Sequence, residues 1–271
     1  MKTTKKITII IIAIFIIGGI TLFSGSGSSE RVNIVGSSSV QPVSEKLAET
    51  YEKTHPDIKI NVQGGGSSVG IKSAQEGLAD IGTSSKELKD DEKQGLTEYN
   101  IGNDGIVIAV NNKNIVNDLS KDQLKDIFSG KITNWNQVGG TDGEIHIITR
   151  EAGSGTLDAF ENLIMDENTK IKSNAIVQSS TESVKQSVKQ DENAIGFVSF
   201  ADMSDDAKSL SIDGVNPSIE TIADGSYELQ RPFLFLVKGN PSGELKDFIE
   251  WVNGSEAQKI LNNEKIIKST S

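Results

Sequence analysis

The chain has 271 residues, of which 27 are Lys or Arg and 38 are Asp or Glu, so its formal net charge is -11. Because it contains no cysteine, the sequence excludes a disulfide framework, a cysteine-ligated metal site and a thiol nucleophile. A nucleic-acid binder gains affinity by neutralising phosphates with a basic face, so the acidic charge argues against that class of protein.

The first 28 residues predict an export signal or a membrane anchor. Three lysines (Lys2, Lys5, Lys6) precede an uncharged apolar run at 7–23, and a spacer of Gly and Ser follows at 24–29. No A-x-A cleavage motif follows, and there is no cysteine to carry a lipid, so we favour a retained anchor over a cleaved signal. Basic residues stay on the cytoplasmic side, which predicts an extracytoplasmic chain, tethered to the cell membrane or secreted after cleavage.

Strands and helices alternate through the next part of the chain. Short apolar or alternating runs predict strands at 31–35, 58–62, 79–82 and 106–110. Helical spacing predicts helices at 40–53, 67–77 and 86–95, and Pro56 ends the first of them.

A second set of elements begins after a polar segment at 111–114. The pattern predicts helices at 120–130, from 154 or 156 to about 165, and at 181–190, with strands at 144–149 and 194–200. A long apolar strand at 229–237, interrupted by Pro232, and helices at 242–252 and 255–262 close the chain. This alternation predicts an α/β protein with parallel sheets covered by helices.

Three strand-to-helix turns, at 36–40, 64–70 and 150–156, consist largely of Gly, Ser and Thr. Each opens a helix, whose free N–H groups and partial positive charge attract anions. Arg150 adds a planar guanidinium that matches an oxyanion. Ser and Thr are also ordinary helix caps, so one such loop would indicate capping alone. Three loops in one chain favour a site for a tetrahedral oxyanion.

Other motifs carry less weight. Residues 66–70 fit the G-x-S-x-G nucleophile elbow with Ser68 as nucleophile, but only His146 follows in the order a hydrolase needs, and it lies within an alternating strand. Residues 202–213 resemble a calcium loop but lack its Gly and Glu. No P-loop motif occurs, so an ATPase would be a separate chain. We therefore predict no catalytic residue, no metal and no cofactor.

Five segments, in this order and spacing, resemble the phosphate-binding proteins that supply phosphate ABC importers: GSSSVQPV, GGGSSVGIK, ADIGTSSKEL, IFSGKITNW and TREAGSGT. The resemblance covers about 31–271. It implies a two-lobed periplasmic-binding-protein-like fold of type 2, α/β in class, with a hinge about which the lobes close on the anion. The implied lobes are 31–110 plus 215–271, and 111–214.

The same resemblance implies a set of phosphate ligands, namely Ser38, Ser39, Ser68, Ser85, Arg150, Ser154, Gly155 and Thr156. Neighbouring Ser37 leaves the register of the first loop open by one residue. Ser85 stands where family members have an aspartate that accepts the proton of hydrogen phosphate. Ala152 stands where an aspartate orients the arginine, and Glu151 is beside it. Because serine lacks a charge that repels sulfate, we expect a weaker preference for phosphate over sulfate.

Taken together, these features predict a monomeric, extracytoplasmic substrate-binding protein, not an enzyme. We expect it to capture inorganic phosphate and deliver it to the membrane permease of an ABC importer. Two alternatives stay open at this point: a phosphate sensor or scavenger module, and a serine hydrolase that uses Ser68.

Overall fold

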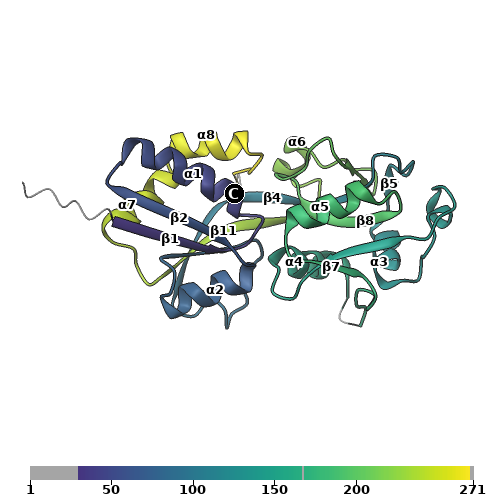
Figure 1. Cartoon of the computed structure of the whole chain (residues 1–271), viewed down its shortest axis with the longest axis horizontal. Coiled ribbons are helices and arrows are strands. Elements are labelled where there is room, and N and C mark those ends of the chain that lie inside the picture. Colours follow the sequence, from purple (N-terminus) through teal and green to yellow (C-terminus); the bar gives the residue numbers. More distant parts are fainter. Residues whose placement is uncertain (1–29, 167, 269–271) are drawn as a thin grey trace, which may run out of the picture.

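The computed structural model describes residues 30–166 and 168–268, which form two lobes side by side along the long axis of the molecule (Figure 1). The expected signal or anchor at 1–28 lies outside the described residues. Within the described part of the chain, no helix has both the length and the apolar character needed to cross a membrane.

The first lobe begins with strands that follow one another in parallel. Its early elements are β1 (Glu30–Gly36), α1 (Gln41–Thr54), β2 (Ile58–Gly64), α2 (Ser67–Glu76) and β3 (Ile81–Ser84). Strand β1 pairs in parallel with both β2 and β3. The chain returns to this lobe at its end, through β11 (Gln230–Lys238), α7 (Gly243–Val252) and α8 (Ser255–Asn263).

The long strand β4 (Leu96–Val110) leads into the second lobe. The elements of this lobe are β5 (Asp118–Leu119), α3 (Lys121–Ser129), the 3₁₀ helix η1 (Trp135–Val138), β6 (His146–Arg150), α4 (Gly155–Ile164), β7 (Ile176–Gln178), α5 (Thr181–Gln190), β8 (Ala194–Ser199), β9 (Lys208–Ser209), β10 (Ser211–Ile212) and α6 (Ile219–Ala223). Strand β6 pairs in parallel with β7 and β8, and β5 pairs with β10 in a separate small sheet.

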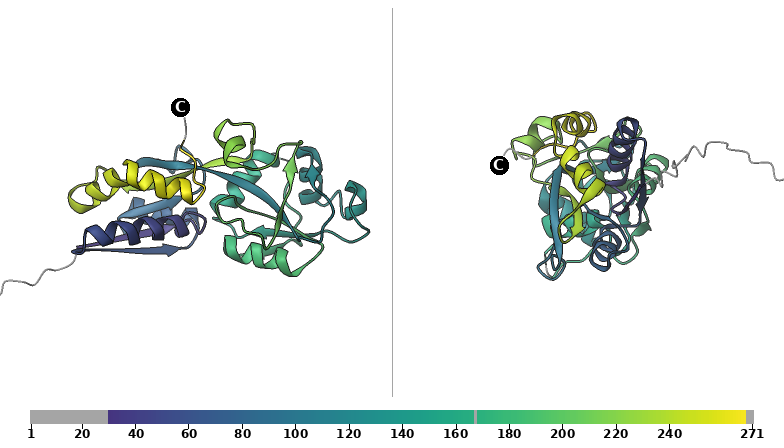
Figure 2. Two further views of the ribbon diagram at one scale, coloured as in Figure 1. Left: turned by 90° about the horizontal axis from the view of Figure 1, so that it is seen from above. Right: turned by 90° about the vertical axis from the view of Figure 1, so that its left-hand side faces the viewer.

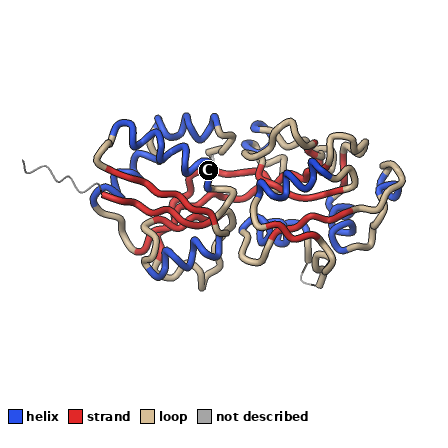
Figure 3. Tube along the Cα trace, viewed as in Figure 1, coloured by secondary structure: helices blue, strands red, loops and turns tan. Residues whose placement is uncertain are grey.

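One curled sheet runs through both lobes, in the strand order β2-β1-β3-β11-β4-β8-β6-β7, with β9 paired to β4. Strand β11 is antiparallel to β3 and β4, and β4 is antiparallel to β8. The sheet is therefore mixed, whereas the sequence pattern predicted parallel sheets. Strands β4 and β11 connect the lobes (Figures 2 and 3), and the antiparallel pairs occur because these two strands run in opposite directions.

Each lobe has helices on both faces of its part of the sheet. In the first lobe, Phe233, Phe235 and Val237 of β11 face the core with α1, α7 and α8, while Leu234 and Leu236 face α2. In the second lobe, alternate residues of β4 contribute to a core with α3 and α4 and to another core with α5. Such alternation is the period-2 pattern of a strand that is buried on both faces. The exact lobe limits at 110/111 and 214/215 stay a prediction.

The segment 86–95 is not the helix that its polar pattern predicted: residues 86–89 are irregular, and 90–95 form consecutive turns that end at Gly95 in a left-handed conformation (φ 72°). Its first side chain, Lys86, is buried and pairs with Glu92. This ion pair folds the segment back on itself instead of presenting both side chains on a helix surface. Strand β4 then starts at Leu96, ten residues before the apolar run at 106–110.

Candidate functional site

Three loops of the first lobe converge at the carboxyl ends of β1, β2 and β3. Parallel strands that are neighbours bring the loops after them to one edge of the sheet. The Ser37 hydroxyl donates to Ser85 Oγ at 2.8 Å. Ser67, the first residue of α2, accepts from the Ser85 N–H at 3.0 Å, and its Oγ lies 3.4 Å from Ser85 Oγ. All three hydroxyls are buried.

The second lobe places two threonines against this edge. Ser39 Oγ lies 3.0 Å from Thr156 Oγ1 of α4 and 3.0 Å from Thr181 Oγ1 of α5. The lobes also touch through their backbones, because the Ser68 N–H donates to the Gly153 carbonyl at 3.1 Å. Ser154 caps α4 by accepting from Leu157 N–H at 3.3 Å. The two lobes are thus in direct contact at the hydroxyls.

Arg150 ends β6 with its side chain 1% exposed. Its Nε and Nη2 each donate to an oxygen of Glu151 at 2.9 Å, which is the bidentate geometry of a strong ion pair. Nη2 also donates to Ser38 Oγ of the other lobe at 3.1 Å, and Nη1 donates to Thr181 at 3.4 Å. Glu151 therefore orients the guanidinium, which is the role expected of an aspartate at the position of Ala152.

A second arginine, Arg231 of β11, reaches the same hydroxyls. Its Nη1 donates to Thr156 Oγ1 at 2.6 Å and to Ser85 Oγ at 3.2 Å. Its Nε and Nη2 donate to Asp104 Oδ2 at 3.2 and 3.0 Å. Burial raises the pKa of the Asp104 carboxyl, while the positive charge of Arg231 opposes this increase. We take the pair as ionised, because a guanidinium keeps its proton in proteins.

These contacts form one continuous hydroxyl cluster, with Arg150 at one end and Arg231 joining its two halves. The cluster is defined by Ser37, Ser39, Ser67, Ser85, Thr156 and Thr181, with Arg150 and Arg231 as its flanking cations. All six hydroxyl groups and both arginines are buried, and they come from both lobes. Such an arrangement of donors can surround a tetrahedral oxyanion with hydrogen bonds and exclude water from it.

The structure brings most of the sequence-predicted residues to this cluster. Ser39, Ser85 and Thr156 belong to it, Ser38 contacts Arg150, and Ser154 and Gly155 begin α4 beside it. Ser68 lies apart: its side chain is exposed, and its buried neighbour Ser67 occupies the cluster instead. A shift of one residue at a helix start turns the side chain by about 100°.

Sequence reasoning missed Thr181, Arg231 and Asp104. A signal was present, because a charged residue in a buried apolar strand almost always has a partner. Arg231 precedes Pro232 in such a strand, and Asp104 precedes the apolar run of β4. The sequence around each of these two residues does not indicate which charged residue is its partner.

The two other polar arrangements that the sequence raised lie elsewhere. His146, at the start of β6, pairs with Asp191 at 2.6 Å. It is four residues from Arg150 along the strand, about 13 Å. Within the described residues no hydrogen bond links the Ser68 hydroxyl to a histidine. Asp80 accepts from the Asn33 backbone N–H at 2.8 Å and thus fastens β1 rather than contacting the cluster.

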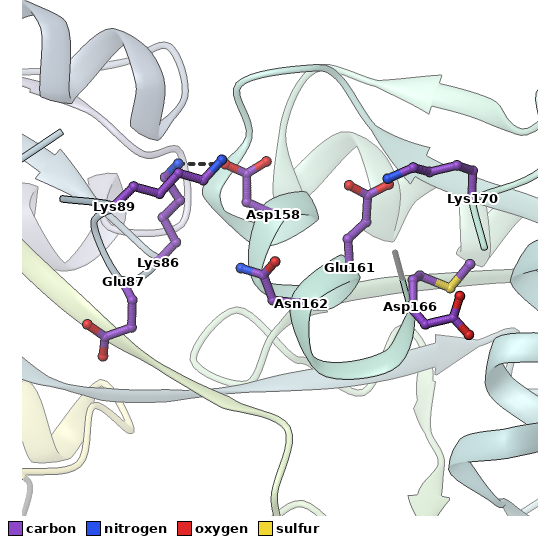
Figure 4. Close-up of a pocket in the computed structure, with 9 residues that line it drawn as sticks. Lys86, Glu87, Lys89, Asp158, Glu161, Asn162, Asp166 and Lys170 are labelled. Atoms are coloured by element: carbon purple, nitrogen blue, oxygen red, sulfur yellow. Dashed lines mark hydrogen bonds and ion pairs between the residues drawn. The ribbon is translucent and has the colours of Figure 1, made fainter. Parts of the chain in front are cut away.

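A groove of about 520 Å³ lies between the lobes (Figure 4). Its rim carries Lys86, whose Nζ lies 2.8 Å from Glu92 of the same lobe and 2.7 Å from Asp158 of α4. Burial opposes the charge of Lys86, but the hydrogen bonds with Asp158 and Glu92 outweigh it and raise the pKa of this lysine. The ion pair Lys86–Asp158 thus joins the lobes.

Two α/β lobes with a cluster of buried donors between them define a two-lobed solute-binding protein. A sequence profile described as the PBP superfamily domain matches residues 24–256. The chain is 34% identical over 240 residues to the phosphate-binding protein PstS of Bacillus subtilis, covering 86% of this chain and 79% of that protein. It is 33% identical over 276 residues to PstS of Staphylococcus aureus (strain USA300), covering 90% and 83%. The chain therefore belongs to the PBP superfamily and, within it, to the family of these phosphate-binding proteins.

Solved structures agree with this assignment. A putative phosphate ABC transporter substrate-binding protein from Clostridium perfringens, with bound phosphate, is 40% identical with a TM-score of 0.86, over 89% of this chain and 100% of that one. An ABC-type phosphate transport receptor from Vibrio cholerae is 35% identical with a TM-score of 0.74, over 87% and 99%. The family resemblance and the two-lobed α/β fold are confirmed.

Proposed function

We propose that this chain binds inorganic phosphate in the hydroxyl cluster and delivers it to the permease subunits of an ABC importer whose ATPase is a separate chain. The observation that carries the proposal is the hydroxyl cluster itself, in which both lobes and two guanidinium groups supply donors within hydrogen-bond distance of one another. The names of the related proteins support phosphate as the anion.

Neutral donors would carry most of the binding. Each guanidinium is already matched by a carboxylate, Glu151 for Arg150 and Asp104 for Arg231. The anion would therefore be held by hydroxyl and backbone N–H groups in a site that excludes water, where such hydrogen bonds are strong. The acidic surface does not oppose capture, because exposed charges are screened beyond about 8 Å at physiological salt.

Closure of the lobes fits the connections between them. In β4, Ile101 packs in the hydrophobic core of the first lobe and Ile106 in that of the second. At β11, Leu229 packs in the core of the second lobe and Phe233 in that of the first. We place the hinge in these two short stretches, which lie within the ranges expected for the first lobe, just before 110 in β4 and well after 215 at β11. Phosphate would bind to one open lobe and draw the other onto it, as in hinged binding proteins generally.

Location, assembly and lack of catalysis belong to the same proposal. The segment 1–28 would act as signal or anchor and place the lobes, as a monomer, outside the cytoplasm. The described residues give Ser68 no base, so the chain would bind without hydrolysing. A fluorophosphonate probe should then leave Ser68 unlabelled, and stoichiometric labelling would favour a hydrolase.

Calorimetry on the full-length protein, purified in detergent, tests the proposal. Phosphate, sulfate, arsenate and molybdate are titrated in turn, and the thermal midpoint is recorded with each. We expect one phosphate per chain and a raised midpoint, since a ligand that binds only the native state stabilises it. If millimolar phosphate produces no heat and no shift of the thermal midpoint, phosphate binding is refuted.

A further inference from the structure

The sequence contains three arginines, and two of them, Arg150 and Arg231, meet at one hydroxyl cluster. Arg231 comes from β11, a strand that runs between the lobes, and not from any of the three Gly/Ser/Thr loops (Figure 2). The third arginine, Arg31, is exposed on β1. The placement of Arg231 therefore needs its own explanation.

Asp104 fixes one edge of the Arg231 fork. Both residues are buried, and they stand directly opposite each other in the β11–β4 register. Asp104 Oδ2 accepts from Nε and Nη2 of Arg231, while Oδ1 accepts from Ser199 Oγ at 2.8 Å and from Ala201 N–H at 3.2 Å. All four acceptor lone pairs of this carboxylate are thus in use, and Nη1 is the guanidinium nitrogen that reaches the hydroxyls.

Nη1 contacts one hydroxyl from each lobe, Ser85 and Thr156. A guanidinium is a donor only, so each hydroxyl must accept from it. Ser85 Oγ also accepts from Ser37, which occupies both of its lone pairs. The Ser85 proton must then be donated, and a hydroxyl in this position cannot accept a proton from a ligand.

The nearby Asp104 carboxylate is equally committed, because it accepts four hydrogen bonds. Glu151 accepts two hydrogen bonds and lies beside Arg150, not beside Arg231. Neither Ser85 nor Asp104 is therefore left as an acceptor for a protonated oxygen of the anion on the Arg231 side. This outcome differs from the sequence expectation that the Ser85 hydroxyl can turn to accept.

We propose that Arg231, fixed by Asp104, is a positioning residue that makes Ser85 an obligate donor and occupies one lone pair of Thr156, so that the site favours a tetrahedral oxyanion with unprotonated oxygens on this side. The proposal rests on the proposed function and adds a specificity to it. Sulfate, which has no proton to place, is then an acceptable ligand beside hydrogen phosphate.

Calorimetry with phosphate and with sulfate at pH 8, on the full-length protein, tests this inference. For the wild type we expect the sulfate Kd to lie within about tenfold of the phosphate Kd, the equivalent of one ordinary hydrogen bond. The double variant Arg231→Met/Asp104→Asn removes both buried charges together, so that neither is left unpaired. It should weaken phosphate binding about tenfold or more and sulfate binding about tenfold further, because Ser85 can accept again.

Two further variants complete the design. Arg31→Gln removes an exposed arginine of the first lobe and should change neither Kd. Arg231→Lys keeps the charge, but one ammonium cannot serve both Asp104 and the two hydroxyls, so the ratio of the sulfate Kd to the phosphate Kd should rise. This variant decides the question if the double variant does not fold.

Several outcomes would overturn the inference while leaving phosphate binding intact. One is a wild type in which a thousandfold excess of sulfate fails to displace phosphate. Another is a double variant, or Arg231→Lys, in which both affinities fall by the same factor, since a purely structural role would not change the ratio. If the wild type binds neither anion, the proposed function itself is wrong.

Discussion

The ion pair Lys86–Asp158 should control how readily the lobes close. The Lys86 side chain is 4% exposed and is shared between Glu92 in its own lobe and Asp158 in the other. Asp158 lies in the first turn of α4, two residues after Thr156 of the hydroxyl cluster. The informative change is Asp158→Asn, which removes the charge that joins the lobes and leaves Glu92 to balance the buried lysine.

The size of the effect follows from burial. Hydrogen bonds to charged groups contribute about 1.5–3 kcal/mol, and solvent at Asp158, whose side chain is 30% exposed, lowers this to about 1–2 kcal/mol. If the loss falls on the closed state, the apparent Kd for phosphate rises by about 5–30-fold. Because Asp158 and Glu92 raise the pKa of Lys86, the effect should not vary between pH 6 and 8.

Calorimetry gives the Kd, and small-angle scattering with and without phosphate reports closure. Asp166→Asn is the matched control, since Asp166 lines the same groove but pairs with Lys125 of its own lobe. It should leave the Kd unchanged. An unchanged Kd in Asp158→Asn, or equal weakening by both variants, would show that the ion pair does not act on closure.

Three more predictions follow from the described contacts. Arg150→Ala should weaken phosphate binding at least tenfold, by about 1.5–3 kcal/mol, without unfolding the protein. An unchanged Kd in calorimetry would show that Arg150 does not contribute to binding. Gly155→Ala would put a Cβ 2.1 Å from Ser67 Oγ and 2.7 Å from Ser85 Oγ. We therefore expect a phosphate titration to give a Kd that is higher by about tenfold or more, while the thermal midpoint of the free protein is unaltered. Burial, assisted by the charge of Asp104, raises the pKa of Asp202 to about 7, and its Oδ2 has no hydrogen-bond partner. A carboxyl with a raised pKa stabilises the fold below about pH 4 and loses this contribution as the pH rises toward 7, so urea unfolding should show a decline of about 1–4 kcal/mol that Asp202→Asn abolishes and Asp205→Asn does not.

Local sequence patterns predicted what local interactions decide. The three Gly/Ser/Thr loops and the helix starts after them follow from turn chemistry and, at α4, from the Ser154 cap, which depend on a few neighbouring residues. The segment 86–95 failed the same reasoning because the burial of Lys86 against Asp158 of the other lobe overrides its helical preference.

The partner of Asp104 could not be predicted because strand register is not a local property. Arg231 lies 127 residues away in sequence and meets Asp104 only because β11 pairs with β4 in one particular register. A shift of one residue would turn each side chain to the other face of the sheet. The choice of Ser67 over Ser68 has a similar origin, since the loop pattern fits both and only the orientation of α2 separates them.

The position of β11 between β3 and β4 also sets an order of assembly. Every strand that pairs in the second lobe precedes residue 213, so that lobe can complete its sheet as soon as its own segment is available. The first lobe, although it begins earlier, must wait with two open strand edges until residues 230–238 arrive. Open edges invite pairing with other chains, so the interval before β11 inserts is when a newly made chain is most exposed to aggregation. The same late insertion delivers Arg231, which means that the last strand of the sheet in chain order also completes the hydroxyl cluster.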